Sequence, residues 1–426
     1  MDVPPIQDAD KDTPAEILAD ISQESVATVI PVAEIDAVEL ESVDESVVVE
    51  NANAEPSQSE PIATSDQFDS ESTGPATSQA VIRLGEDALT RDPVTWNAGI
   101  KGNPHLMIVG LPGMGKTVAL INICQQLVEQ RITPIVFSYH PDIDDRLAAQ
   151  VSGVRLLDHQ QLGFNPLQVD GESKHGHIDN AGILRDIFAA MYPEFGDVQL
   201  SRIRSAIVKS YTDLGWGTAR RAGTPEFRAF FDLMQDEEKP DATTRNIVSR
   251  LEELKDYGVF DTSGAVRSLL SSNEPSVLRI HATQNENVQK AVAMLGLYNI
   301  YKEMFRRGEQ QRITHAVVFD EAHRASRLRL IPRLAAECRK FGVALIVASQ
   351  SARDFDPVVY SQVANYLLLR LTEQDAKQLA KNITTSDQAR RVADRVKQLP
   401  KFQALFFREG LRVPNTVLLS APNEYR

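Results

Sequence analysis

The sequence predicts an α/β fold in which helices cover a doubly wound, mostly parallel sheet. From about residue 100 onward, short apolar runs alternate with longer segments of helical period, as a parallel sheet with crossover helices requires. A glycine-rich turn follows the first of these runs, and carboxylates and an amide follow later ones. Because ligands of such sheets bind at the carboxyl ends of the strands, these polar residues are expected to meet at one edge.

The glycine-rich turn is a complete G-x-x-x-x-G-K-T phosphate loop between the apolar run 106–109 and a helical stretch at 117–128. Glycines let successive backbone N–H groups approach phosphates at the helix N-terminus. Lys116 then supplies charge to the β- and γ-phosphates, and Thr117 offers a hydroxyl to Mg²⁺. We therefore expect a RecA-like P-loop NTPase fold that takes ATP and Mg²⁺. The loop residues are Gly110, Leu111, Pro112, Gly113, Met114, Gly115, Lys116 and Thr117.

Residues 1–80 do not have the composition of a folded domain. They contain 19 Asp or Glu, one Lys and a single aromatic residue, Phe68, which gives a formal charge of −18. Since the whole chain carries −14, residues 81–426 carry +4. A segment of this kind buries too little apolar surface to offset its ordering entropy. We expect a disordered acidic arm ahead of a mildly basic folded part.

The folded part divides into a core and an insertion. Residues 81–177 are the first part of the ATPase core, residues 178–260 are an α-helical insertion subdomain rich in Arg, Leu and Ala, and residues 261–426 complete the core. The predicted core strands lie at 106–109, 133–138, within 155–169, and at 276–280, 316–319, 343–349, 366–371, 402–408 and 415–420. The predicted core helices lie at 117–128, 285–307 and 331–341, and more than one helix is predicted near 374–398.

A second NTPase motif is Asp320-Glu321-Ala322-His323, which ends the apolar run 316–319. A carboxylate at this edge can hold Mg²⁺ through its water shell, and the next one can orient or deprotonate the attacking water. We assign Asp320 to the metal and Glu321 to the water. An acidic helix N-cap is the alternative interpretation, and the phosphate loop upstream favours the catalytic one.

Gln350 ends the next apolar strand and is assigned to sensing the γ-phosphate or holding the lytic water. A strand-end residue that only hydrogen-bonds its neighbours is the alternative. The letters D-E-A-H also occur in superfamily 2 helicases, but that class requires a second RecA-like domain with an arginine-rich Gly motif, and we find none downstream.

Together these motifs resemble the HerA/FtsK superfamily of ring-forming DNA-pumping ATPases, which includes the type IV secretion and conjugation motors. The resemblance rests on the phosphate loop, the D-E-A-H strand, the helix that ends Arg-Lys-Phe-Gly at 339–342 and the strand that ends Ala-Ser-Gln at 348–350, and it covers about residues 90–420. Residues 164–167, Phe-Asn-Pro-Leu, and the helical insertion after them fit the same pattern. The W-x-x-x-x-x-x-N-P-H lead-in at 96–105 is most similar to DptH-type ATPases of phosphorothioation-dependent DNA restriction.

The resemblance implies a homo-hexamer with active sites between subunits and an arginine that reaches the neighbour's γ-phosphate. Arg339, 19 residues after Asp320, occupies the matching position, with Arg333 and Lys340 as alternatives. A guanidinium suits this role because it is always charged and can neutralise charge on phosphate oxygens. HerA proteins carry an N-terminal β-barrel where this chain has the acidic arm, and this difference favours assembly with a partner protein.

The expected function is that of a Mg²⁺-dependent ATPase acting as a DNA translocase or helicase subunit in a DNA-defence, restriction or mobile-element system, with a nuclease supplied by a partner. Two alternatives stay open: an ATP-gated switch or scaffold for a protein partner, and a secretion or conjugation motor. No apolar run of 18 residues and no signal peptide are found, so a cytoplasmic protein is expected. Two basic runs, near 324–340 and 390–401, are candidates for contact with DNA phosphates.

Overall fold

The computed structural model describes residues 80–158, 163–169, 175–261, 268–322, 330–351, 353, 355, 357–408 and 413–420. The predicted acidic arm lies outside these residues except for Ala80. His323 of the D-E-A-H motif lies outside them too, as do the first three arginines of the earlier basic run, Arg324, Arg327 and Arg329.

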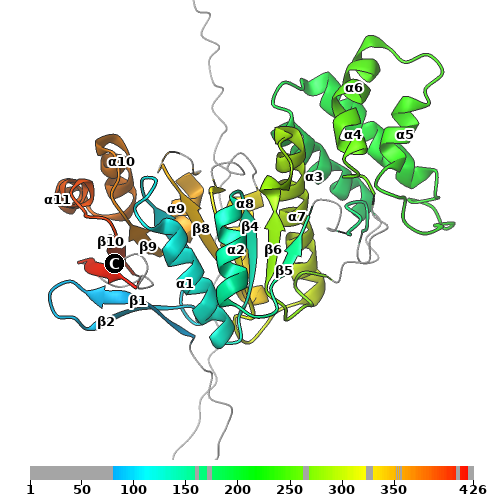
Figure 1. The fold of residues 1–426 in the computed structure, drawn as a ribbon. Helices are drawn as coiled ribbons and strands as arrows, with labels where there is room; N and C mark the ends of the chain where they lie inside the picture. The colour runs from blue at the N-terminus through cyan, green and yellow to red at the C-terminus, as the bar shows by residue number, and fades with distance from the viewer. Residues whose placement is uncertain are drawn as a thin grey trace, which may run out of the picture. The chain divides into compact units, whose positions relative to one another are not determined.

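Among the described residues, eleven strands form one sheet in the order β2-β1-β11-β10-β9-β3-β8-β7-β4-β6-β5 (Figure 1). The seven strands from β9 to β5 are parallel, and the four at the other end pair antiparallel. The parallel strands are β3 (Leu106–Val109), β4 (Thr133–Ser138), β5 (Arg155–Leu157), β6 (Ser276–Arg279), β7 (His315–Phe319), β8 (Val343–Ser349) and β9 (Asn365–Leu368). The antiparallel strands are β1 (Val81–Asp87), β2 (Pro93–Asn97), β10 (Gln403–Phe407) and β11 (Asn415–Leu419).

The central strands are buried on both faces because helices cover each face. Side chains alternate along β3: Leu106 and Ile108 join one apolar cluster, and Met107 and Val109 join the other. On the first face pack α1 (Lys116–Glu129) and α2 (Pro141–Gln150). On the second pack α7 (Glu286–Arg307), α8 (Leu330–Glu337), α9 (Pro357–Gln362), α10 (Glu373–Ile383) and α11 (Ser386–Lys397).

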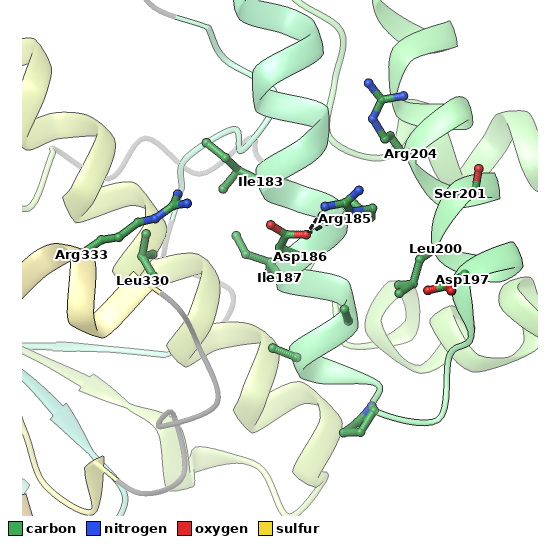
Figure 2. Close-up of a pocket in the computed structure, with 13 residues that line it drawn as sticks. Ile183, Arg185, Asp186, Ile187, Asp197, Leu200, Ser201, Arg204, Leu330 and Arg333 are labelled. Atoms are coloured by element: carbon green, nitrogen blue, oxygen red, sulfur yellow. Dashed lines mark hydrogen bonds and ion pairs between the residues drawn. The ribbon is translucent and has the colours of Figure 1, made fainter. Parts of the chain in front are cut away.

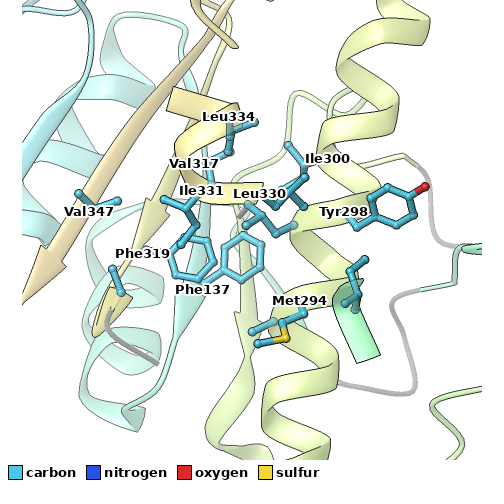
Figure 3. Close-up of a cluster of buried hydrophobic side chains, with 14 of the residues drawn as sticks. Phe137, Met294, Tyr298, Ile300, Val317, Phe319, Leu330, Ile331, Leu334 and Val347 are labelled. Carbon is cyan, nitrogen blue, oxygen red and sulfur yellow. The ribbon is translucent and has the colours of Figure 1, made fainter. Parts of the chain in front are cut away.

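Figure 3 shows the centre of the second cluster, where Phe137 of β4 and Phe319 of β7 stack with ring centroids 4.1 Å apart. Leu330, Ile331 and Leu334 of α8 cover these rings from above. The apolar spacing of α8 therefore packs this helix on β7, the strand that Asp320 follows.

Among the residues that the structure describes between β5 and β6 are four helices: α3 (Gly176–Met191), α4 (Asp197–Thr212), α5 (Ala229–Gln235) and α6 (Ala242–Asp256). Their apolar side chains belong to the same cluster as the second face of the sheet. The Asn180 amide donates to the Pro166 carbonyl at 2.9 Å and to the Tyr211 hydroxyl at 2.8 Å, and its oxygen accepts from the Tyr298 hydroxyl of α7. The predicted Phe-Asn-Pro-Leu turn is thus held in a buried hydrogen-bond network.

The doubly wound, mostly parallel sheet confirms the predicted fold class, and two local features differ from prediction. The helix predicted at 331–341 changes to a 3-10 turn, η4 (Cys338–Phe341). The helices predicted near 374–398 are α10 and α11. Thr384 and Thr385, both extended, separate them. The hairpin of β1 and β2 was not predicted, because β1 is stabilised by pairing with β11, far away in sequence. Within the described residues, no helix has the length and apolar character needed to cross a membrane.

Candidate active site

The phosphate loop connects β3 to α1 at the carboxyl edge of the sheet, as its sequence predicts. Gly113 and Gly115 have φ of 75° and 114°, a region that glycine enters without strain. At Gly110 a Cβ would lie 2.6 Å from the Leu369 Cβ, so only glycine lets the loop pass this close to the end of β9. The loop is tied to both neighbouring strands, since Gly110 N donates to the Ser349 carbonyl at 3.2 Å and Leu111 N to the Arg370 carbonyl at 2.8 Å.

Lys116 begins α1 and lies buried over the loop. Its Nζ donates to the Gly110 carbonyl at 2.7 Å and to the Leu111 carbonyl at 3.3 Å. Burial lowers the pKa of this ammonium, and the nearby carboxylates of Glu321 and Asp320 oppose that shift. Thr117 follows in the first turn of α1 and is half-buried.

Asp320 and Glu321 directly follow β7, two strands away from the phosphate loop. Both are buried. Burial raises the pKa of Asp320 to about 6, and the adjacent Glu321 carboxylate adds to the rise, whereas His140 and Lys116 act against it. Two carboxylates and one ammonium therefore share a poorly solvated site, which favours binding of a further cation.

Gln350 lies at the end of β8, between the phosphate loop and the carboxylates. Its Nε2 donates to Glu321 Oε1 at 2.6 Å. The backbone of Glu321 has a φ of 58°, a left-handed conformation that is uncommon for a residue other than glycine. Strain of this type persists where the surroundings impose it, as at active sites. The amide therefore holds the carboxylate that we assigned to the water.

The geometry of these side chains fits a triphosphate with Mg²⁺. Lys116 bonds carbonyls of its own loop, and a phosphate would be a stronger, charge-assisted acceptor for the same ammonium. No cluster of three or more His, Cys, Asp or Glu with metal-binding geometry occurs in the described ranges. Mg²⁺ in NTPases needs no such cluster, because water, phosphate oxygens and one or two protein oxygens complete its shell. Thr117 and Asp320 are the residues that would hold it.

Arg339 is not part of this constellation. It lies in η4, before the amino end of β8, and its Nη1 donates to the Gly102 carbonyl at 3.1 Å ahead of β3. Because β3 and β8 are parallel, that is the edge of the sheet opposite to the phosphate loop. Arg339 and Lys340 are exposed there, and Arg333 is exposed on α8. The positions of Arg339 and Lys340 exclude a role at their own subunit's loop and are compatible with a role in trans.

Arg333 borders a groove of about 830 Å³ between α3, α4 and α8 (Figure 2). Arg185 and Arg204 line it too, and Arg185 pairs with Asp186 at 2.5 Å. None of its lining residues belongs to the phosphate loop or to the motif at 320–321. The groove is therefore separate from the candidate active site.

Three residues near the site were not anticipated from the sequence. His140 follows β4, and its Nε2 lies 3.9 Å from Glu321 Oε1. Arg370 follows β9, and Phe402 precedes β10, both beside the phosphate loop. His140 and Arg370 are polar residues just beyond apolar strands, the same signal that marks Asp320 and Gln350. For Phe402 no such signal exists, because its position depends on antiparallel pairing.

The chain is similar to curated DNA double-strand break repair helicases named HerA. It is 22% identical to that of Sulfurisphaera tokodaii over 334 residues, 73% of this chain and 60% of the relative, and 21% identical to that of Saccharolobus solfataricus, covering 74% and 63%. The chain thus spans less than two thirds of these relatives. No family model matches it.

Among solved structures, VirB4 of Thermoanaerobacter pseudethanolicus superposes with a TM-score of 0.66 at 20% identity, covering 81% of this chain and 98% of that one. The bacterial conjugative coupling protein TrwB superposes with 0.55 at 14% identity, covering 82% and 90%. TrwB in complex with ADP and Mg²⁺ superposes with 0.52, covering 75% and 85%.

Proposed function

We propose that the chain is a P-loop ATPase of the HerA/FtsK superfamily and that it couples Mg²⁺-dependent ATP hydrolysis to movement along DNA. The observation that carries the hydrolytic part is the meeting of Lys116, Asp320, Glu321 and Gln350 at one edge of the sheet. The DNA-moving part is supported by the likeness to HerA, which is named as a DNA repair helicase.

Each residue has a distinct task in this proposal. The backbone from Gly110 to Gly115 and the Lys116 ammonium bind phosphate oxygens, and Thr117 and Asp320 would hold Mg²⁺. Mg²⁺, when bound, neutralises charge on the phosphate oxygens. Glu321 accepts a proton from the attacking water, and Gln350 keeps its carboxylate in position through the bond at 2.6 Å.

In this proposal, a ring of subunits completes each active site with a residue from the neighbouring subunit. Arg339 is on the opposite edge of the sheet from its own phosphate loop, so in a closed homo-hexamer it is free to reach the next subunit's γ-phosphate. We place the ring in a DNA-defence, restriction or mobile-element system in which a partner supplies any nuclease. The likeness to VirB4 and TrwB keeps a conjugation or secretion motor as the second candidate.

The test is ATP turnover with and without DNA in Lys116→Ala and Glu321→Gln. Lys116→Ala is expected to abolish both ATP binding and turnover. Glu321→Gln is expected to bind ATP normally and to lose turnover by roughly 10²–10⁴-fold, because only the proton acceptor is removed. The matched controls are Lys101→Ala and Glu309→Gln, which change exposed residues of the same types. Full turnover in Glu321→Gln would refute its role, and turnover that DNA does not stimulate would favour an ATP-gated switch.

A further inference from the structure

The positions of the catalytic groups give the direction in which ATP must lie. Asp320, Glu321 and Gln350 follow β7 and β8, on one side of β3. In the proposed function the γ-phosphate lies beside them, so we place the nucleoside end on the side of β9, the other neighbour of β3. The side chains at the carboxyl end of β9 and the amino end of β10 are therefore the ones expected to surround the ribose and base.

Arg370 is the first of these side chains. Its Nε and Nη2 lie 3.2 Å and 3.1 Å from the sulfur of Met114 in the phosphate loop. A guanidinium carries five donors, and a thioether is a weak acceptor. The side chain is half-buried, and in the described part of the chain it has no carboxylate within ion-pair distance. Because its partner at the loop is so weak an acceptor, the Arg370 guanidinium is suited to donate to a phosphate oxygen instead.

Phe402 lies on the same side. The pairing of Leu405 with Leu368 and of Phe406 with Leu367, continued along β10, brings Gln403 opposite Arg370. Phe402 N donates to the Met114 carbonyl at 3.1 Å, and its ring closely approaches Gly115, where an added Cβ would lie 2.8 Å from Cδ1. Arg370 and Phe402 thus contact the loop from adjacent strands and meet at Met114.

The backbone of Phe402 is held in an unusual conformation. Its φ is 63°, in the left-handed region that bulky residues avoid. The Lys401 ammonium lies 4.8 Å from the ring centroid, and the ring is half-buried. Bonds at the Phe402 N–H and carbonyl, the latter from Leu419 N, maintain this conformation and present the aromatic ring beside the loop.

We propose that Arg370 and Phe402 form the subsite for the nucleoside end of ATP, with Arg370 on an oxygen of the α-phosphate and Phe402 stacked on the base. This rests on ATP binding at the phosphate loop. An aromatic ring suits the base because every nucleobase has a π face, and the guanidinium adds charge where the phosphates end.

The test compares binding of ATP and of inorganic triphosphate, each with Mg²⁺, by calorimetry. Inorganic triphosphate has the phosphates but no base, so it separates stacking from the integrity of the loop. Phe402→Leu keeps an apolar side chain and is expected to weaken ATP by roughly tenfold while triphosphate changes less than about twofold. Phe402→Trp is expected to restore ATP binding. Arg370→Gln is expected to weaken both ligands by roughly tenfold, because it removes a charged phosphate contact.

Phe305→Leu, at an exposed aromatic residue of α7, is the matched control and should change neither affinity. Equal weakening of both ligands in Phe402→Leu would show that the ring only supports the loop and would overturn the stacking role. Unchanged affinities in Arg370→Gln would overturn the phosphate role. If the wild type bound no ATP, or Lys116→Ala bound it normally, the proposed function itself would fail.

Discussion

Asp320 is buried next to Glu321, and this makes it costly to ionise in the absence of a metal. A carboxyl whose pKa is raised from 3.8 to about 6 on folding binds more protons in the native state than in the unfolded state. Its contribution to stability is therefore largest at low pH and is lost as the pH rises from 3.8 through about 6.

Asp320→Asn should accordingly stabilise the nucleotide-free chain at neutral pH while abolishing turnover. The gain in the free energy of unfolding is at most about 3 kcal/mol at pH 7.5 and should vanish near pH 4, where the native carboxyl is already protonated. Chemical denaturation from pH 4 to pH 8 measures it. A variant less stable than the wild type at pH 7.5 would contradict the raised pKa.

The sequence predicted the candidate site residues that belong to local motifs. The phosphate loop, Asp320, Glu321 and Gln350 each follow the end of a predicted strand. Because the carboxyl ends of parallel strands lie at one edge of the sheet, the sequence also predicted that these residues share that edge. Their roles stay proposals. The bond between Gln350 and Glu321 and the approach of His140 were not predictable, because they depend on side-chain conformations across three strands.

At the scale of elements, the helical insertion is packed on the core by one continuous apolar cluster. The polar centre of that contact is Asn180, which bonds the Pro166 carbonyl and the hydroxyls of Tyr211 and Tyr298. The Tyr211 hydroxyl also donates to the Leu167 carbonyl at 2.5 Å. The predicted subdomain limits, 178 and 260, stay a prediction, although no described residue between β5 and β6 is in a strand.

Asn180→Leu should lower the free energy of unfolding by about 2–4 kcal/mol, because it leaves buried polar partners without their bonds. Denaturation with guanidinium measures the loss, and Val198→Ala, at an exposed position of α4, is the control. A single transition is expected, since the cluster is shared by core and insertion. Two transitions would show that the insertion unfolds alone.

Local pattern predicted the central strands well, since 106–109, 133–138 and 343–349 coincide with β3, β4 and β8. It also predicted β10 and β11, at 402–408 and 415–420, but it did not predict β1 and β2. The alternation of β1 is short and half exposed, and its partner β11 lies more than 300 residues later. Pairing over such a distance leaves no trace in the nearby sequence.

At the scale of the whole molecule, the opposite placement of Lys116 and Arg339 leads to a test of shared sites. Lys116→Ala and Arg339→Ala should each lose turnover when pure. Mixed together, they should regain part of it, because some interfaces then combine an intact loop with an intact arginine. The expected recovery is on the order of a tenth or more of the wild-type rate, against the 10³–10⁵-fold effect of an arginine finger.

ATP turnover of the mixture is measured, and the molecular mass of the same sample in solution is determined with ATP and with DNA. The mass shows whether a hexamer forms. Arg333→Ala and Lys340→Ala, mixed with Lys116→Ala in the same way, identify the finger if Arg339 is not the one. No recovery in any mixture of a proven hexamer would indicate that each subunit hydrolyses ATP without its neighbour.

The sequence by itself determined the fold class and indicated the kind of ligand that we propose, because a phosphate loop and strand-end carboxylates are local patterns set by backbone geometry and charge. Only the tertiary structure decided which side chains surround that ligand. Parallel pairing places Gln350 on Glu321, antiparallel pairing brings Phe402 to Gly115 and Met114, and the 3-10 turn leaves Arg339 at the far edge. These contacts join residues tens to hundreds of positions apart, so they arise from packing and register and not from any one segment.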